Sequence, residues 1–177
     1  MEFQDNEISI KIPKHEQKEK KGFFKSSYYT VYTVLTICKL TGIEMHDVQR
    51  RDSDFEYLLK NLQDNVEYQS IMLPSLPDKK YIGNSDDQFI KERRHKLEGF
   101  LRHLLDQDNR IKADSMIKAF LTHDAKQWLE TKKNPTSYLS QMKSLANAMA
   151  TTSLSVTDIA GNLVNKFQGT AEPFVLK

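Results

Sequence analysis

Hydrophobic and polar residues alternate along the first third of the chain in the pattern of β-strands. Residues 8–12, ISIKI, place an isoleucine at every second position, so they predict a strand that ends at Pro13. Residues 28–40 are dense in tyrosine, valine, threonine and isoleucine, as a central strand is, and residues 43–51 offer a third strand. Short links between successive strands predict an antiparallel meander.

From Phe55 onward the apolar residues follow the spacing of a helix. Positions i, i+3, i+4 and i+7 form one apolar face made of Phe55, Leu58, Leu59 and Leu62. The preceding Ser53-Asp54-Phe55-Glu56 fits a capping box, which predicts Ser53 as the N-cap. Asp54 would then lie in the first turn, where a negative charge favours the helix dipole.

Two more helices are expected after a proline-rich segment. Residues 73–80, LPSLPDKK, favour extended polyproline II conformation because their two prolines forbid a helix. A long helix is expected over residues 88–105, where Arg93 interrupts the apolar stripe, and a shorter one around residues 116–121. Three strands followed by helices are the element order of an α+β fold.

Two segments differ from this core pattern. Residues 14–21, KHEQKEKK, carry no apolar anchor and are expected to form a solvated loop. After Asn134-Pro135 the chain has two amphipathic segments, 138–149 and 156–167, whose polar faces consist of Ser, Thr, Asn and Gln. Such helices suit a bilayer surface, but they equally suit packing on the domain or on a partner helix.

Composition narrows the functional classes. The chain has 177 residues and a net charge of +2, so any anionic partner must be bound by a local cluster, and nucleic acid is not expected. The single cysteine, Cys38, lies in an apolar run and is expected in the core of a cytosolic protein. The sequence shows no signal peptide, no metal-binding histidine spacing and no glycine-rich phosphate loop, so we expect neither an enzyme nor a metal or cofactor site.

Three cationic residues are candidates for an anion site, which needs several fixed donors that converge in space. Arg51 ends a predicted strand, Lys79 follows the prolines, and Arg93 lies on the inner face of a predicted helix. An unpaired buried charge is costly, so Arg93 must extend to solvent or have a partner. That partner is either a ligand or a carboxylate at the edge of the core such as Asp52.

The order of these motifs resembles the PX (phox homology) domain. The motifs read Arg50-Arg-Asp-Ser-Asp-Phe55, then Pro74-Ser-Leu-Pro-Asp-Lys79, then Glu92-Arg-Arg-His-Lys-Leu97-Glu-Gly-Phe-Leu101. The match covers residues 8–122 and implies the PX fold, an α+β fold in which a three-stranded antiparallel sheet packs on a helical subdomain with a proline-rich loop. The following residues, including Trp128 and Lys132-Lys133, are similar to the segment that joins PX to BAR in sorting nexins, especially the branch with Snx4-like and Snx7/Snx30-like members.

This resemblance implies a domain organisation. Residues 1–7 would be an N-terminal tail, residues 8–123 the PX domain, and residues 124–177 a linker with amphipathic helices. The tail is too short for a BAR domain, which would be absent or truncated. A sorting-nexin dimer partner is expected if the full-length protein has one.

The resemblance also implies binding of phosphatidylinositol 3-phosphate, in membrane trafficking and protein transport. The protein would be cytoplasmic and peripheral on early endosome membranes. By motif position, Arg51 would hold the 3-phosphate, Lys79 the 1-phosphate and Arg93 the ring hydroxyls. Tyr81 and Ile82 would insert into the bilayer beside the head group.

One position departs from the family pattern. The family has an aromatic residue after the second arginine, where it stacks under the inositol ring, and this chain has Asp52. The carboxylate either faces the site and opposes a phosphate, or turns outward and pairs with Arg50 at the edge of the pocket. The alternative function is therefore a PX-fold protein-interaction module with an impaired lipid pocket.

Overall fold

The computed structural model describes residues 8–22, 26–78, 86–136, 138–142, 144–145 and 147–148. The chain divides into two compact units, Met1–Lys133 and Asn134–Lys177, which are considered separately. Among the described residues, no helix combines the length and the apolar character that crossing a bilayer requires.

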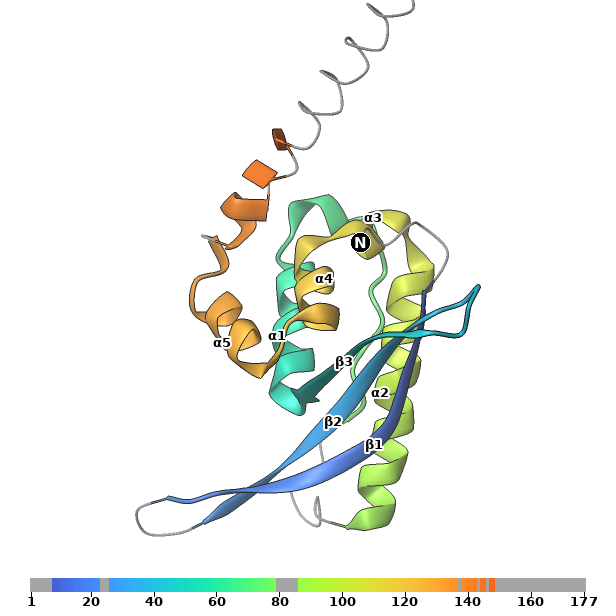
Figure 1. Ribbon diagram of the computed structural model, residues 1–177, viewed down its shortest axis with the longest axis vertical. Coiled ribbons are helices and arrows are strands. Elements are labelled where there is room, and N and C mark those ends of the chain that lie inside the picture. The colour runs from blue at the N-terminus through green and yellow to red at the C-terminus, as the bar shows by residue number, and fades with distance from the viewer. Residues whose placement is uncertain are drawn as a thin grey trace, which may run out of the picture. The chain divides into compact units, whose positions relative to one another are not determined.

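The sheet of the first unit is the predicted antiparallel meander. Its strands are β1 (Ile8–Lys20), β2 (Ser27–Cys38) and β3 (Glu44–Arg51), in the order β1-β2-β3 (Figure 1). Alternate residues of the central strand β2 and of β3 face the helices, so Val34 and Val48 are buried opposite each other. Cys38, expected in the core, is half-buried at the end of β2.

Strand β1 differs from its prediction because it continues through Pro13 to Lys20. The expectation of a strand that ends at Pro13, followed by a solvated loop over residues 14–21, is therefore wrong. The pairing of β1 with β2 shifts register between Lys11 and Lys14, which takes Pro13 out of the ladder. Because β1 is an edge strand, a proline without an N–H is tolerated there. Beyond it, charged side chains suit a two-stranded ribbon that is open to solvent.

The helices follow the sheet in chain order. They are α1 (Asp52–Gln63), the short 3₁₀-helix η1 (Val66–Tyr68), α2 (Asp87–Gln107), α3 (Asn109–Ala113), α4 (Ser115–Thr122) and α5 (Ala125–Lys133). The N-cap predicted for α1, Ser53, is wrong, because Arg51 takes that position. The carboxylate of Asp54, in the first turn as predicted, accepts the Arg51 N–H at 2.9 Å and closes the helix start.

The core lies between the sheet and the helices α1, α2 and α4. Aromatic rings form its centre, with Phe55 against Phe120 at 5.1 Å and Phe120 against Trp128 at 5.4 Å between ring centroids, both edge to face. Trp128 is 2% exposed. Helix α5, which carries this tryptophan, therefore belongs to the first compact unit, although the sequence placed it in the linker.

The second unit is helical where it is described, over residues 135–136, 138–142, 144–145 and 147–148. The N–H of Tyr138 donates to the Asn134 carbonyl at 3.1 Å, and the Ser140 hydroxyl donates to the Thr136 carbonyl at 2.8 Å. Of these, the residues from 138 onward belong to the first predicted amphipathic segment, 138–149. The second, residues 156–167, lies outside the described part of the chain.

Candidate functional site

Arg93 lies on the inner face of α2, as its place in the apolar stripe predicts, and is 7% exposed. Its Nε donates to Oδ1 of Asp52 at 2.7 Å. Its Nη1 donates to the carbonyl oxygens of Pro77 at 3.1 Å and of Asp78 at 2.6 Å. One guanidinium therefore joins the start of α1, the inner face of α2 and the proline-rich segment.

Asp52 is the first residue of α1, and its side chain is directed toward Arg93. The carboxylate is 35% exposed, so it stays in contact with solvent while it pairs with the arginine. Of the two orientations that the sequence left open, the structure has the one that faces the candidate site. The expected alternative, an outward Asp52 paired with Arg50, is wrong.

Tyr32 lies close to this ion pair at the base of the site. Burial raises the pKa of its phenol, the negative charge of Asp52 raises it further, and Arg93 acts in the opposite sense. The phenol is 1% exposed and therefore stays protonated at physiological pH. A neutral aromatic ring thus supports the Asp52–Arg93 pair from within the core.

Arg51 ends β3, and its side chain is 48% exposed. It lines a pocket of about 320 Å³ together with residues from the β1–β2 ribbon and from α5, including Lys18, Trp128 and Lys132. Arg93 is not among the lining residues of this pocket. The structure therefore places Arg51 on the α5 side of the β3–α1 junction, whereas Arg93 lies against the proline-rich segment.

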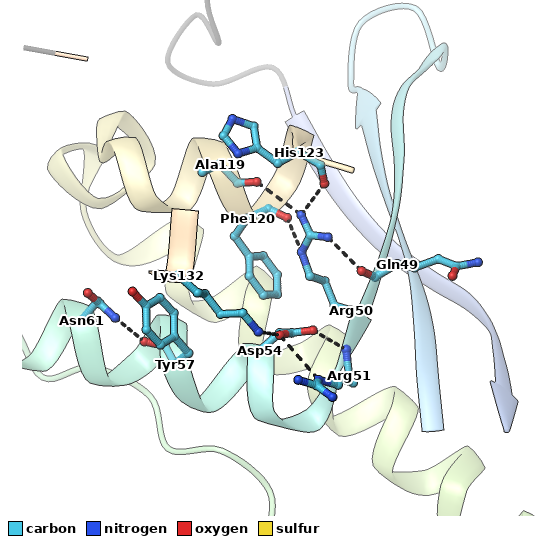
Figure 2. A network of polar contacts seen from close by, with 10 residues as sticks. All are labelled: Gln49, Arg50, Arg51, Asp54, Tyr57, Asn61, Ala119, Phe120, His123 and Lys132. Carbon is cyan, nitrogen blue, oxygen red and sulfur yellow. Dashed lines mark hydrogen bonds and ion pairs between the residues drawn. The ribbon is translucent and has the colours of Figure 1, made fainter. Parts of the chain in front are cut away.

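Arg50, expected at the edge of the pocket, is instead a core residue with no exposed surface. Figure 2 shows its guanidinium facing the carbonyl oxygens at the C-terminal end of α4. It donates to the carbonyls of Gln49 (2.8 Å), Ala119 (3.2 Å), Phe120 (2.9 Å) and His123 (2.7 Å). Burial lowers the pKa of Arg50 to about 10, so the guanidinium stays charged at neutral pH and caps the helix.

The structure also reveals a polar cluster that sequence reasoning missed. Asp54 is buried beside Arg51, and its Oδ1 forms an ion pair with Nζ of Lys132 (Figure 2). The two residues are 78 positions apart in the chain. No local motif joins them, because only the packing of α5 brings Lys132 to the start of α1.

Three predicted site residues, Lys79, Tyr81 and Ile82, lie outside the described residues. Lys79 directly follows Asp78, whose carbonyl accepts from Arg93. Within the described ranges, no group of three histidine, cysteine, aspartate or glutamate side chains is arranged to hold a metal ion.

Comparison with known proteins identifies the class of domain. Residues 40–124 match the family model of the PX domain. The X-ray structure of a designed CISK-PX domain is 30% identical, and the match covers 64% of this chain and 97% of that one with a TM-score of 0.51. The crystal structure of the mouse SNX19 PX domain with bound sulphate ion has the same TM-score at 23% identity, and it supports the fold alone. The chain belongs to the PX domain family.

Among curated proteins, the relatives are named for protein sorting. The vacuolar protein sorting-associated protein 5 of Saccharomyces cerevisiae is 31% identical over 99 residues, which are 56% of this chain and 14% of that protein. Its namesake in Schizosaccharomyces pombe is 34% identical over 52% of this chain and 16% of its own length. The sorting nexin MVP1 of Candida albicans is 34% identical over 60% of this chain and 14% of its own length. The chain spans about a seventh of these relatives, and the resemblance to sorting nexins is confirmed.

Proposed function

We propose that this chain binds a phosphoinositide head group, that of phosphatidylinositol 3-phosphate, and acts in protein transport as a peripheral protein on endosomal membranes. The observation that carries the proposal is the position of Arg93. It is buried on α2 and bonded both to Asp52, next to Arg51, and to the carbonyl of Asp78, next to Lys79. The three family positions therefore belong to segments that meet at one guanidinium.

Each cationic residue has a distinct role in this proposal. Arg51 binds the 3-phosphate, because it ends a strand and keeps about half of its side chain exposed. Lys79 binds the 1-phosphate, and Arg93 binds the ring hydroxyls. Tyr81 and Ile82 insert into the bilayer next to the head group.

Asp52 sets the strength of this binding. Its carboxylate takes Nε of Arg93 at 2.7 Å, so an oxygen of the protein occupies a donor that a ligand oxygen would otherwise accept from. It also brings a negative charge toward a phosphorylated ligand, which at an effective dielectric near 20 costs on the order of a few kcal/mol at several ångströms. The head group must displace this carboxylate or bind without that donor. The chain therefore binds the lipid head group with low affinity.

The same ion pair favours a second candidate function, a PX-fold module that binds protein. Arg93 has a carboxylate and two carbonyl partners, so its buried charge is satisfied without a ligand. In this case the sorting-nexin dimer partner or a cargo protein, and not the lipid, would localise the chain.

Liposome flotation of the full chain separates the two candidates. We expect the wild type to bind neutral liposomes that contain phosphatidylinositol 3-phosphate. Arg51→Ala should bind the same liposomes at least about tenfold more weakly. Arg110→Ala is the matched control, because that exposed arginine pairs with Asp108, far along the chain from the site. Equal binding to liposomes with unphosphorylated phosphatidylinositol would contradict head-group recognition, and no binding to either kind of liposome would support the protein-binding module.

A further inference from the structure

The carboxylate of Asp54 lies between two cations, immediately behind the arginine that is proposed to bind phosphate. Asp54 is 5% exposed. Its Oδ2 accepts the backbone N–H of Arg51 at 2.9 Å, and its Oδ1 pairs with Nζ of Lys132. Oδ1 is also 4.0 Å from Nε of Arg51, a distance at which the guanidinium is attracted but forms no hydrogen bond.

Lys132 comes from α5, which begins after residue 124, where the match to the PX family model ends. The helix is fixed on the domain by Trp128, whose ring packs edge to face on Phe120 and, at 5.8 Å between centroids, on Tyr57. Nζ of Lys132 lies 5.8 Å from the Trp128 ring centroid, and the lysine side chain is 16% exposed. The ammonium group is therefore held in place beside Asp54.

A buried carboxylate needs a cationic partner, and the side chains of Lys132 and Arg51 both come within 4.0 Å of Asp54. With Lys132 present, the charge of Asp54 is compensated from the α5 side, and the Arg51 side chain stays about half exposed. Without Lys132, the guanidinium of Arg51 would be drawn across the 4.0 Å gap to Asp54. The same loss would leave a negative charge directly behind any bound phosphate.

The pocket of about 320 Å³ supports this relation between the two residues. Arg51 and Lys132 both line it, together with Lys18 from the β1–β2 ribbon. A phosphate bound by Arg51 is in the electrostatic field of Lys132, and among the described side chains that line the pocket Asp54 is the acidic one.

We propose that Lys132 is a positioning residue of the anion site: it compensates Asp54 and so leaves the Arg51 guanidinium available for the phosphate group. The inference rests on the proposed function of Arg51 and extends it to a helix outside the matched family segment. Lys132 acts through Asp54 and Arg51, and it needs no direct contact with the ligand.

Isothermal titration of the full chain with inositol 1,3-bisphosphate, the soluble head group, tests the proposal. Lys132→Met is expected to weaken binding on the order of tenfold, because Asp54 loses the cation that it contacts directly and draws the Arg51 guanidinium away from the ligand. Lys133→Met is the matched control, since the neighbouring lysine pairs with Glu130 and is 56% exposed. It should leave the affinity unchanged within about twofold.

A rescue experiment distinguishes this electrostatic role from a purely structural one. The double variant Asp54→Asn/Lys132→Met removes both charges, so it should bind the head group within about twofold of the wild type. Lys132→Arg should also bind as the wild type does, because it keeps the charge. Should Lys132→Met fail to fold, as judged by its thermal unfolding, Lys132→Gln and the double variant give the same comparison.

The outcomes separate failure of this inference from failure of the proposed function. Wild-type affinity in Lys132→Met, together with a loss in Arg51→Ala, would overturn the inference and leave head-group binding intact. A double variant as weak as Lys132→Met would likewise overturn it, because charge compensation would then not be the cause. An absence of wild-type binding to both the soluble head group and the lipid in liposomes would overturn the proposed function itself.

Discussion

Two buried arginines, Arg50 and Arg93, differ in the kind of partner that satisfies them. Arg50 has no exposed surface and donates to four backbone carbonyls, three of them at the C-terminal end of α4. Arg93 is 7% exposed and donates to two carbonyls and to the side chain of Asp52. Both guanidinium groups connect elements that are distant in the sequence.

This difference in partners determines which of the two arginines a ligand can reach. Backbone carbonyls at a helix end cannot leave without opening the helix, so Arg50 is part of the fold. A side-chain carboxylate that is 35% exposed can rotate away, so Asp52 is an exchangeable partner of Arg93. Arg93 is therefore the buried arginine that a competing anion can engage.

The largest expected effect is the loss of Arg50. Arg50→Met removes a donor from four carbonyls, of which that of Ala119 keeps the His123 N–H, and it removes the cation from above the Phe120 and Trp128 rings. We expect the free energy of unfolding to fall by about 3–5 kcal/mol, measured by urea denaturation. Arg51→Met is the adjacent control and should cost less than about 1 kcal/mol, because its side chain is half exposed. Equal losses in the two variants would contradict the comparison.

Truncation of Trp128 tests whether α5 belongs to the core that surrounds Arg50. The guanidinium carbon of Arg50 lies 5.0 Å from the Trp128 ring centroid, and the indole is 2% exposed. Trp128→Ala should therefore lower the free energy of unfolding by about 3–5 kcal/mol. Leu129→Ala, at a neighbouring position that is 45% exposed, should cost much less. A small effect of Trp128→Ala would mean that α5 is not an integral part of the domain.

Removal of Arg93 should cost less stability than removal of Arg50. Arg93→Met leaves Asp52 with solvent as an alternative partner and frees two carbonyls of the proline-rich segment. We expect a loss of about 1–3 kcal/mol in the same urea measurement. A loss as large as that of Arg50→Met would show that Arg93 is also a structural residue, and the distinction between the two arginines would fail.

The smallest expected effect is a pH dependence of the free energy of unfolding that arises from His123, whose carbonyl accepts from Arg50. Burial and the positive charge of Arg50 hold the pKa of His123 below its usual 6.5, and Asp124 opposes them. Because the unfolded chain takes up the proton more readily, stability should be full above about pH 6.5 and fall as the pH drops below it. The slope of unfolding free energy against pH should be shallower in His123→Gln. An unchanged slope would exclude His123 as its source.

The sheet order, α2 and the inner-face position of Arg93 could be predicted from the sequence because they depend on local periodicity and motif order. The continuation of β1 past Pro13 could not be predicted from the sequence. This segment is polar, and its backbone pairing with β2 keeps it in the strand. The direction of Asp52 is decided by Arg93, 41 positions away. The ion pair of Lys132 with Asp54 depends on the packing of Trp128 against Phe120, which no local sequence pattern predicts.

The central claim is that Asp52 competes with the head group for Arg93, and one titration tests it directly. Inositol 1,3-bisphosphate is titrated into the wild type, Asp52→Asn and Asp47→Asn, a control that removes an exposed carboxylate from β3. The account predicts that Asp52→Asn binds about tenfold more tightly than the wild type, while Asp47→Asn changes the affinity by less than about twofold. Equal affinities in Asp52→Asn and the wild type would contradict it, because the carboxylate would then not compete with the ligand.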